Sequence, residues 1–506
     1  MKIWLDITST TQISLGDCDN DCIPECDPNY IPNMKRSVFA FCQPFVKDKF
    51  LHLRTSLLRQ AEPLHRQQCE QDRWLVCNPT GSGTVAVLDH QVNRLLDQFR
   101  SARLLGDVQA AMPEVAPERI EATTALLHQS GLLYCDSSPS APSPSASPQT
   151  LTAWLHVTNL CNLRCNYCYV EKSHESMTED TALRSVDAVF RSALKQRFKK
   201  VRLKYAGGEA SLHMSRVISI HDYATEQAQD SGLELSATLL TNGVVLSRRA
   251  IDSLKLRHIS VSISLDGIGE AHDRQRPFQH GQASFKYVNA TIQRLLENDL
   301  APHISVTVSQ RNLDGLSELL EYILARGLSF SLSYYRDNEH AVERDTLQFG
   351  EMEMIKGMRT AFAVIERQLP RRSLLGSLID KANLNALHQR TCGVGNNYLV
   401  IDQHGQVAKC HANIKDTIST IYADDPLQVI RNDRKSVQNL AVDEKEGCRN
   451  CDWRYWCGGG CPLLTYRLTK RYDIKSPNCT IYRVLFPDAL RLEGLRLLKY
   501  EDPIVF

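Results

Sequence analysis

Three cysteines, Cys161, Cys165 and Cys168, lie close together in a C-x3-C-x2-C arrangement. Three thiolates on one tight loop can bind three irons of a four-iron, four-sulfur cluster and leave the fourth iron open to a small molecule. A Cys3His zinc site is the alternative, and it would need a nearby fourth ligand such as His156 or His174. We favour the iron–sulfur interpretation because the loop directly follows the first strand of a predicted series of β/α units.

Polar or glycine-rich residues follow the next predicted strands. They are Gly207, Gly208, Glu209, Asn242, Ser264 and Asp266, with Arg276 a short distance beyond. Active sites in parallel α/β folds lie at the carboxyl ends of the strands, so these residues are candidates for ligand binding. For Asp266, a turn-forming role in the Asp-Gly pair is an open alternative.

Seven further cysteines occupy the last part of the chain. Cys392 and Cys410 are separated by seventeen residues, and a Cys448-x2-Cys451-x5-Cys457-x3-Cys461 run is followed by Cys479. Clustered cysteines in a reducing compartment are metal ligands more often than disulfides. A zinc ribbon is the alternative to iron–sulfur clusters here. Long periodic segments are scarce after about residue 390, so we expect bound metal rather than apolar burial to order this block.

The hydrophobic periodicity indicates which elements position these residues. Strand-like runs alternate with helical segments downstream of residue 150. The predicted strands are 152–159, 200–207, 233–243, 258–267, 302–309 and 328–336, and the helices lie near 179–197, 213–230, 247–255, 284–298, 313–326 and 351–368. Six βα units predict a parallel sheet with an outer layer of helices.

Residues 137–149 contain six Ser and four Pro, which predicts an extended linker and a domain boundary. Upstream, RWLVCNP and TVAVLD predict a hairpin, and three helical stretches follow, so we expect a small winged-helix-like domain. Its sequence shows no concentrated basic face, which disfavours DNA binding. The role of Cys18, Cys22 and Cys26 stays open between a metal site and a reduced loop.

The composition is that of an ordinary globular protein. Of 506 residues, 42% are hydrophobic and 23% charged, and 59 Lys and Arg balance 58 Asp and Glu to a net charge of +1. Overall charge therefore gives no attraction to nucleic acid or to an anionic membrane. Because neither a secretory signal nor an 18-residue apolar stretch is found, we expect a cytoplasmic protein without nucleic-acid or membrane partners.

The triplet, with Tyr167 before its last cysteine and Gly207-Gly208-Glu209 after the second strand, resembles the radical S-adenosylmethionine (SAM) enzymes. The resemblance implies a partial (β/α)6 TIM-like barrel of α/β class. It also implies a [4Fe–4S] cluster whose open iron chelates SAM, and a 5′-deoxyadenosyl radical that abstracts a substrate hydrogen.

The same resemblance assigns roles to the polar residues at the strand ends. The implied SAM contacts are Tyr167 beside the adenine, Gly207 and Gly208 as points of close backbone approach, Glu209 on that loop or on the cation, and Asn242 and Ser264 at the ribose or carboxylate. Asp266 and Arg276 are the candidate catalytic pair.

The later cysteines resemble the SPASM extension of radical SAM enzymes that modify peptides and proteins, which holds two auxiliary [4Fe–4S] clusters. By this resemblance the distal cluster is bound by Cys448, Cys451, Cys457 and Cys479, and the proximal one by Cys392, Cys410 and Cys461. Since no cysteine lies between Cys168 and Cys392, the proximal cluster has an open iron or is completed by His388 or a substrate atom.

Residues 72–136 resemble a PqqD-like recognition element, which binds a leader peptide as an added strand at a sheet edge, here expected around Trp74 to Cys77. The expected divisions are a Cys-containing segment (1–71), this winged-helix domain (72–136), the linker (137–149), the radical SAM barrel (150–370), and the SPASM domain with a C-terminal helix (371–506).

These resemblances imply a maturase of a ribosomally synthesised, leader-bearing precursor peptide. It would install a carbon–carbon or thioether crosslink, or a related backbone change, with flavodoxin or ferredoxin as electron donor. The alternatives are a sulfatase-maturing type that oxidises a Ser or Cys on a protein, and a non-catalytic zinc-binding adaptor.

Overall fold

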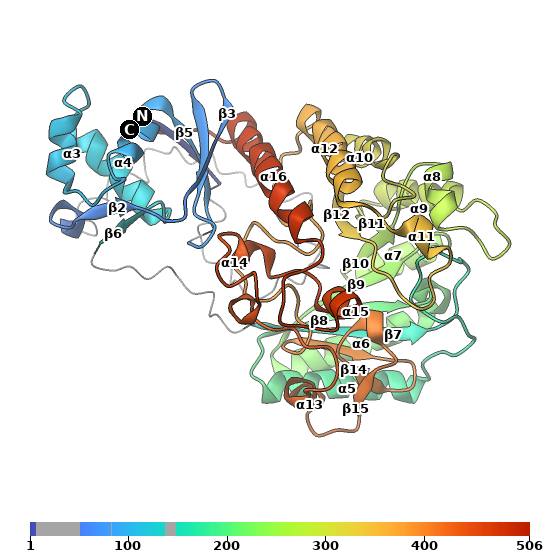
Figure 1. The fold of residues 1–506 in the computed structure, drawn as a ribbon. Helices are drawn as coiled ribbons and strands as arrows, with labels where there is room; N and C mark the ends of the chain where they lie inside the picture. The colour runs from blue at the N-terminus through green and yellow to red at the C-terminus, as the bar shows by residue number, and fades with distance from the viewer. Residues whose placement is uncertain (7–50, 82, 137–147) are drawn as a thin grey trace.

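The computed structural model describes residues 1–6, 51–81, 83–136 and 148–506, which form two lobes with the long helix α16 (Cys479–Tyr500) packed between them (Figure 1). Most of the predicted Ser/Pro linker lies outside the described residues, as do Cys18, Cys22, Cys26 and Cys42.

The larger lobe is built on a nine-stranded sheet in the order β12-β11-β10-β9-β8-β7-β13-β14-β15. Its strands β7 to β12 pair in parallel and in chain order. They are β7 (Thr150–Thr158), β8 (Lys200–Gly207), β9 (Glu234–Thr241), β10 (Ile259–Ser264), β11 (His303–Val308) and β12 (Ser329–Tyr334). All six predicted strands are present, with ends that differ by a few residues.

Helices cover the convex side of this sheet. They are α5 (Glu179–Lys195), α6 (Met214–Ser231), α7 (Arg248–Leu256), α8 (Glu270–Gln275), α9 (Phe285–Glu297), α10 (Leu316–Ala325), α11 (Arg344–Leu347) and α12 (Glu351–Arg367), with a 3-10 helix η3 (Ala210–His213) before α6. Side-chain caps fix two of the starts, because Thr178 accepts from the Thr181 amide and Ser247 from the Ala250 amide. The six predicted helices are confirmed, and the parallel sheet places all six strand ends at one mouth.

The chain after residue 390 extends the sheet beyond β7. Strand β13 (Tyr398–Ile401) pairs in parallel with β7, and β14 (Gln406–Ala408) and β15 (Thr417–Thr420) follow antiparallel. The remaining elements are η4 (His411–Asn413), α13 (Pro426–Asn432), η5 (Val442–Glu444), α14 (Arg454–Cys457), α15 (Pro462–Thr469) and α16. The expectation that metal replaces apolar burial here is wrong in part, because Trp456, Tyr482 and Phe486 belong to the main hydrophobic core.

The N-terminal lobe contains a sheet in the order β16-β1-β5-β4-β3. Its strands are β1 (Lys2–Leu5), β3 (His65–Glu70), β4 (Arg73–Cys77), β5 (Val85–Asp89) and β16 (Ile504–Val505); the smaller pair is β2 (Leu58–Gln60) with β6 (Leu133–Cys135). The helices are η2 (Leu51–Arg54), α2 (His90–Asp97), α3 (Leu105–Ala111) and α4 (Pro117–Gln129). The predicted hairpin and three helices are present, and both chain ends meet in this sheet (Figure 1).

The sheet order corrects one expectation. Strand β4 lies between β5 and β3, so the segment from Trp74 to Cys77 is not an exposed edge. The edge strand beside β4 is β3, whose sequence HRQQCE lacks the regular apolar alternation of a predictable strand.

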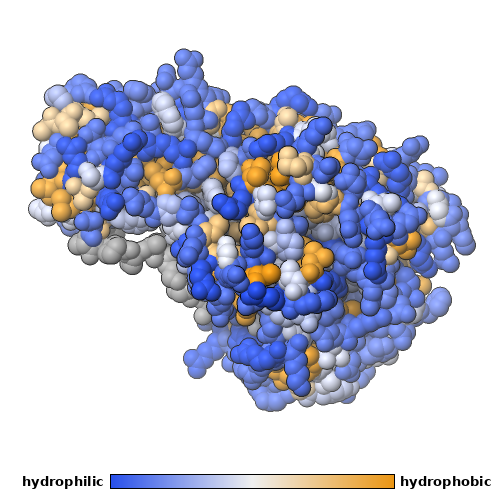
Figure 2. Space-filling model, viewed as in Figure 1, coloured by the Kyte–Doolittle hydropathy of each residue, from blue (hydrophilic) through white to orange (hydrophobic). Residues whose placement is uncertain are grey.

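No helix in the described part of the chain has both the length and the hydropathy needed to cross a bilayer. Figure 2 shows a mostly hydrophilic face on which apolar residues form small, separated groups.

A buried arginine links α16 to the N-terminal strand. Arg496 is 3% exposed, and its guanidinium donates to Glu493 (2.7 Å), to Asp6 (2.9 Å) and to the Arg371 carbonyl (2.9 Å). Burial opposes the charge of Arg496, but the carboxylates of Glu493 and Asp6 hold its pKa above the ordinary value. Arg496 and the buried carboxylate of Glu493 therefore each need the other's charge.

We expect Arg496→Met to destabilise the protein by about 3 kcal/mol, because it leaves the buried Glu493 carboxylate without a cation. The matched control on the same helix is Arg491→Met, whose partly exposed pair with Glu366 should contribute less than about 1 kcal/mol. Denaturant unfolding followed by circular dichroism measures both. Equal losses in the free energy of unfolding would show that the buried ion pair of Arg496 contributes no more than the partly exposed pair of Arg491.

Candidate functional site

The concave side of the six parallel strands encloses a cavity of about 340 Å³. Each strand contributes a side chain to it: Trp154, Ala206, Leu240, Ser262, Ser305 and Ser331. Two groups of cysteines also line it, namely Cys161, Cys165 and Cys168 from the loop after β7, and Cys392, Cys410 and Cys461 from the C-terminal block. The structure thus brings the predicted triplet and the predicted proximal set to one cavity.

The end of β8 is fastened to the loop that carries the triplet. The Gly208 amide donates to the Thr158 carbonyl (2.6 Å), and the Glu209 amide to the Leu160 carbonyl (2.8 Å). A Cβ added at Gly207 would lie 2.3 Å from the Thr158 carbonyl oxygen, and one at Gly208 would lie 2.4 Å from that of Leu160. Glycine is therefore needed here for contact with the neighbouring loop, whereas the sequence suggested approach to SAM.

Glu209 connects the same loop to the end of β9. It is 2% exposed, and its carboxylate accepts hydrogen bonds from the Ser211 amide (3.1 Å), the Thr241 hydroxyl (2.6 Å) and the Asn242 amide (2.6 Å). Because the buried carboxylate already accepts three hydrogen bonds from the neighbouring loops, the geometry favours the loop-stabilising role among the two that the sequence left open.

Asn242 in turn contacts the triplet. Its side-chain amide donates to Asn162 Oδ1 (2.7 Å) and approaches Cys161 Sγ at 3.8 Å. Asn242 and Ser264 both line the cavity, as the sequence predicted for SAM contacts. Their predicted hydrogen bonds to SAM stay predictions.

Asp266 and Arg276 form a buried ion pair, with 2.6 Å between Arg276 Nε and the carboxylate. The Asp266 carboxylate is fully buried and also accepts from the Tyr167 hydroxyl (2.5 Å) and the Thr307 amide (2.8 Å). Arg276 lies over the Tyr167 ring and reaches Cys165 Sγ at 3.8 Å. Only Arg276 and Tyr167 line the cavity, so the geometry favours a positioning role for Asp266 over contact with substrate.

The electrostatics of this group follow from its burial. Burial raises the pKa of Tyr167 well above its ordinary value, so the phenol stays protonated and donates to Asp266. Burial opposes the charge of Arg276, yet Asp266, Tyr167 and Cys165 hold its pKa well above the usual range. Burial, and then Arg276, lower the pKa of the adjacent His272 to about 4, which leaves that ring neutral.

Lys172 was missed by sequence reasoning, although it follows the triplet closely. Its ammonium lies 3.0 Å from Cys168 Sγ and lines the cavity. Burial alone would lower the pKa of Lys172, but the thiols of Cys168 and Cys161 raise it above its ordinary value. Burial raises the pKa of Cys165 to about 12, so metal binding there must displace a proton.

The three cysteines that the C-terminal block contributes to the cavity also have a cation near them. Arg336, two residues after β12, forms a 2.7 Å ion pair with the fully buried Asp380 side chain, and the nearby Cys461 thiol helps to raise the pKa of Arg336. Asn439 donates to Cys392 Sγ at 3.7 Å. Burial raises the pKa of Cys410 to about 12.

The four predicted distal cysteines also come together. Burial raises the pKa of Cys457 to about 12, and Cys448, Cys451 and Cys479 lie near enough to add to that rise. His388, one of the three alternatives that the sequence left open for completing the proximal cluster, does not line the cavity. Its ring packs where a Cβ on Gly458 would lie, next to Cys457.

Lys445 lies between the two C-terminal sets and is 1% exposed. Burial lowers its pKa, and the thiols of Cys448 and Cys457 from one set, and of Cys392 and Cys461 from the other, oppose that fall. A fully buried ammonium needs negative charge nearby.

The donor set of the triplet fits a [4Fe–4S] cluster with three protein ligands. Three sulfurs on one loop face the cavity, and two cations, Lys172 and Arg276, approach them at 3.0 and 3.8 Å. Those cations offset the negative charge that metal-bound thiolates carry. Hydroxyls from β10, β11 and β12 line the cavity beside it: Ser262, Ser264, Ser305, Thr307, Ser331 and Ser333.

Comparison with known proteins agrees with this geometry. Residues 155–323 match the family model of the Radical SAM superfamily. An uncharacterised protein of Methanocaldococcus jannaschii is 28% identical over 190 residues, which cover 37% of this chain and 64% of that protein. The antilisterial bacteriocin subtilosin biosynthesis protein AlbA of Bacillus subtilis is 23% identical over 335 residues, 62% of this chain and 67% of AlbA. The chain thus spans about two thirds of the length of these relatives.

Among solved structures, anSMEcpe with bound AdoMet and a Cp18Cys peptide aligns with a TM-score of 0.57 and 18% identity, covering 69% of this chain and 99% of that one. The alignment confirms the predicted radical SAM barrel fold. The winged-helix and SPASM assignments stay predictions.

We expect Lys172→Met to weaken retention of the triplet's cluster about tenfold or more, since a charge-assisted hydrogen bond contributes roughly 1.5–3 kcal/mol. Lys172→Arg keeps the charge and should retain most of the cluster, and the exposed Lys199→Met is the control. Electron paramagnetic resonance follows the SAM-responsive cluster signal during timed exposure to a chelator. Loss at the wild-type rate in Lys172→Met would contradict the role given to Lys172.

Proposed function

We propose that this protein is a radical SAM enzyme that modifies a ribosomally synthesised precursor peptide by hydrogen abstraction. The observation that carries the proposal is the single cavity lined by both Cys161, Cys165 and Cys168 and Cys392, Cys410 and Cys461. A substrate in this cavity would lie between a SAM-binding cluster and a second metal centre.

The triplet would hold the first cluster, and SAM would lie against Tyr167, Asn242 and Ser264. When bound and reduced, the cluster supplies the electron that cleaves SAM to a 5′-deoxyadenosyl radical. Glu209, Asp266 and Arg276 would keep the surrounding loops in place, because their partners are protein groups. The hydroxyl-lined strands β10 to β12 would offer hydrogen bonds to a polar peptide.

Two auxiliary [4Fe–4S] clusters would complete the enzyme, bound by the proximal set and by Cys448, Cys451, Cys457 and Cys479. The buried Lys445 supports this assignment. Its charge faces thiols of both sets, and thiolates bound to metal would supply the negative charge that an interior ammonium requires.

The peptide substrate is supported by two of the relatives. AlbA is by name a biosynthesis protein of a bacteriocin, and the fold neighbour anSMEcpe holds a peptide together with AdoMet. A carbon–carbon or thioether crosslink, or a related backbone change, is the product we propose, with flavodoxin or ferredoxin as the electron donor.

Capture of the leader peptide would occur at the edge strand β3 of the N-terminal lobe, which we propose to be the PqqD-like domain. The outer side of β3 has no strand partner among the described residues. A leader peptide added there would extend the five-stranded sheet by β-augmentation. Gln67 of β3 donates to the Pro487 carbonyl of α16 (2.9 Å), so this edge is connected to the catalytic lobe.

We expect the triple variant Cys161→Ala, Cys165→Ala, Cys168→Ala to produce no 5′-deoxyadenosine, because the open iron is lost with its ligands. Anaerobically reconstituted protein, chemically reduced and supplied with SAM, is the assay. Cys69→Ala, at a buried thiol outside the three sets, is the control. Unchanged deoxyadenosine production in the triple variant would rule out the radical reaction, and stoichiometric zinc in place of iron would favour an adaptor.

Proline substitutions along His65–Glu70 test the leader site. Amides of an antiparallel edge strand alternate between the sheet and the free side. We therefore expect proline at outward amides to raise the KM for precursor peptide about fivefold or more, with SAM cleavage in the absence of peptide unchanged. Proline at the intervening positions should destabilise the lobe.

This scan is cleaner than deleting residues 1–136, since Leu75 packs against Gly494 of α16. If folded variants at every outward amide bind precursor as the wild type does, leader recognition lies elsewhere. The sulfatase-maturing type of substrate then becomes the better hypothesis.

A further inference from the structure

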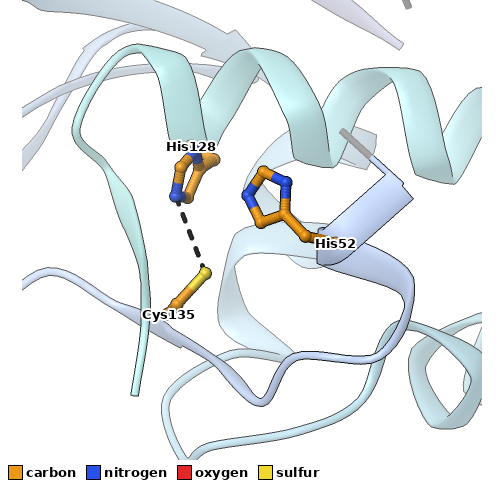
Figure 3. A group of neighbouring side chains, drawn as sticks. All are labelled: His52, His128 and Cys135. Carbon is orange, nitrogen blue, oxygen red and sulfur yellow. Dashed lines mark hydrogen bonds between the residues drawn. The ribbon is translucent and has the colours of Figure 1, made fainter. Parts of the chain in front are cut away.

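Three potential metal ligands converge in the N-terminal lobe, outside every cysteine set described above. His52 comes from η2, His128 from the last turn of α4, and Cys135 from the end of β6. Their ligand atoms all lie within 4.8 Å of one another. Figure 3 shows the two imidazole rings and the thiol directed toward one another.

The fold explains why residues so far apart in sequence meet. Gly131, with a φ of +68°, reverses the chain after α4, so β6 returns beside that helix. Strand β6 then pairs antiparallel with β2, with Leu58 opposite Cys135. Because η2 directly precedes β2, this pairing brings His52 to the end of β6.

The spacing suits one small ion. His128 Nε2 lies 3.9 Å from Cys135 Sγ, and the ring centres of His52 and His128 are 6.1 Å apart. Zn–N bonds of about 2.0–2.1 Å and Zn–S bonds of about 2.3 Å in a tetrahedron place nitrogen and sulfur about 3.6 Å apart. A contraction of a few tenths of an ångström would therefore bring His128 and Cys135 to bonding distance, and the ligand atom of His52 lies within 4.8 Å of both.

The environment suits metal entry. His52 is exposed, and His128 and Cys135 are half-buried, so an ion can reach the site from solvent.

We propose that His52, His128 and Cys135 bind one Zn²⁺ ion, with a fourth position filled by water. Imidazole nitrogen and thiolate sulfur are the ligands that zinc prefers, and three protein ligands leave one position open. The ion would join η2, α4 and β6, and so stabilise the lobe at the point where the chain leaves it toward the barrel. This site does not depend on the proposed radical chemistry.

The test uses the full-length chain after anaerobic reconstitution of its iron–sulfur sites, followed by addition of Zn²⁺ and gel filtration. We expect one zinc per chain, and X-ray absorption at the zinc edge should show one sulfur and two imidazole nitrogens as protein ligands. His52→Gln and Cys135→Ser should reduce bound zinc to on the order of a tenth or less. The exposed His90→Gln, in the same lobe, is the matched control.

His52 is exposed, so its replacement should not disturb folding, which makes His52→Gln the decisive variant. Zinc should raise the unfolding midpoint of the wild type and of His90→Gln, but not that of His52→Gln. Unchanged zinc content in His52→Gln, a four-sulfur zinc environment, or no zinc retained by the wild type would each overturn the proposal.

Discussion

Each of the three cysteine sets in the described part of the chain faces a buried or half-buried cation, and this pairing of charges is the constraint on which the site depends. Lys172 and Arg276 approach the triplet, Arg336 lies near Cys461, and Lys445 lies between the two C-terminal sets. Interior ammonium and guanidinium groups cost several kcal/mol unless anions lie beside them. Asp266 and Asp380 are those anions for Arg276 and Arg336. Thiolates held by metal would be those anions for Lys172 and Lys445, so these two lysines and the proposed clusters would stabilise each other.

The surrounding fold keeps these charged groups in register. Parallel strands bring their carboxyl ends to one mouth, and hydrogen bonds between neighbouring ends then fix the loops. Glu209 joins the end of β8 to that of β9, and Asp266 joins the end of β10 to β11 and to the triplet loop through Tyr167. The segment that follows residue 390 closes the open side of the partial barrel and adds the second cysteine set to the same cavity. Substrate in this cavity would therefore meet both centres without any large movement of the chain.

Much of this arrangement could be predicted from local sequence patterns. The spacing of the triplet indicates an iron–sulfur site, and the six βα units have strong hydrophobic periodicity. Arg276 was among the predicted site residues, whereas Lys172, Arg336 and Lys445 look like ordinary surface residues until the fold buries them. Strand β3 is mostly polar, and β1 and β16 are short strands from opposite ends of the chain. The local sequence therefore does not predict any of these three strands. The sequence also could not show why glycine is needed at Gly207 and Gly208, because the reason is their close contact with the loop that follows β7.

We have proposed that the triplet holds a cluster with one iron that is open to SAM. Mössbauer spectroscopy of the full-length chain reconstituted with ⁵⁷Fe, recorded with and without SAM, tests it most directly. We expect [4Fe–4S] signals in which SAM makes one iron of the triplet's cluster distinct from the rest, because SAM would bind the iron that the three triplet cysteines leave open. The same change should be absent when Cys161, Cys165 and Cys168 are replaced. If SAM leaves the wild-type spectra unaltered, the triplet does not hold a cluster with an iron open to SAM.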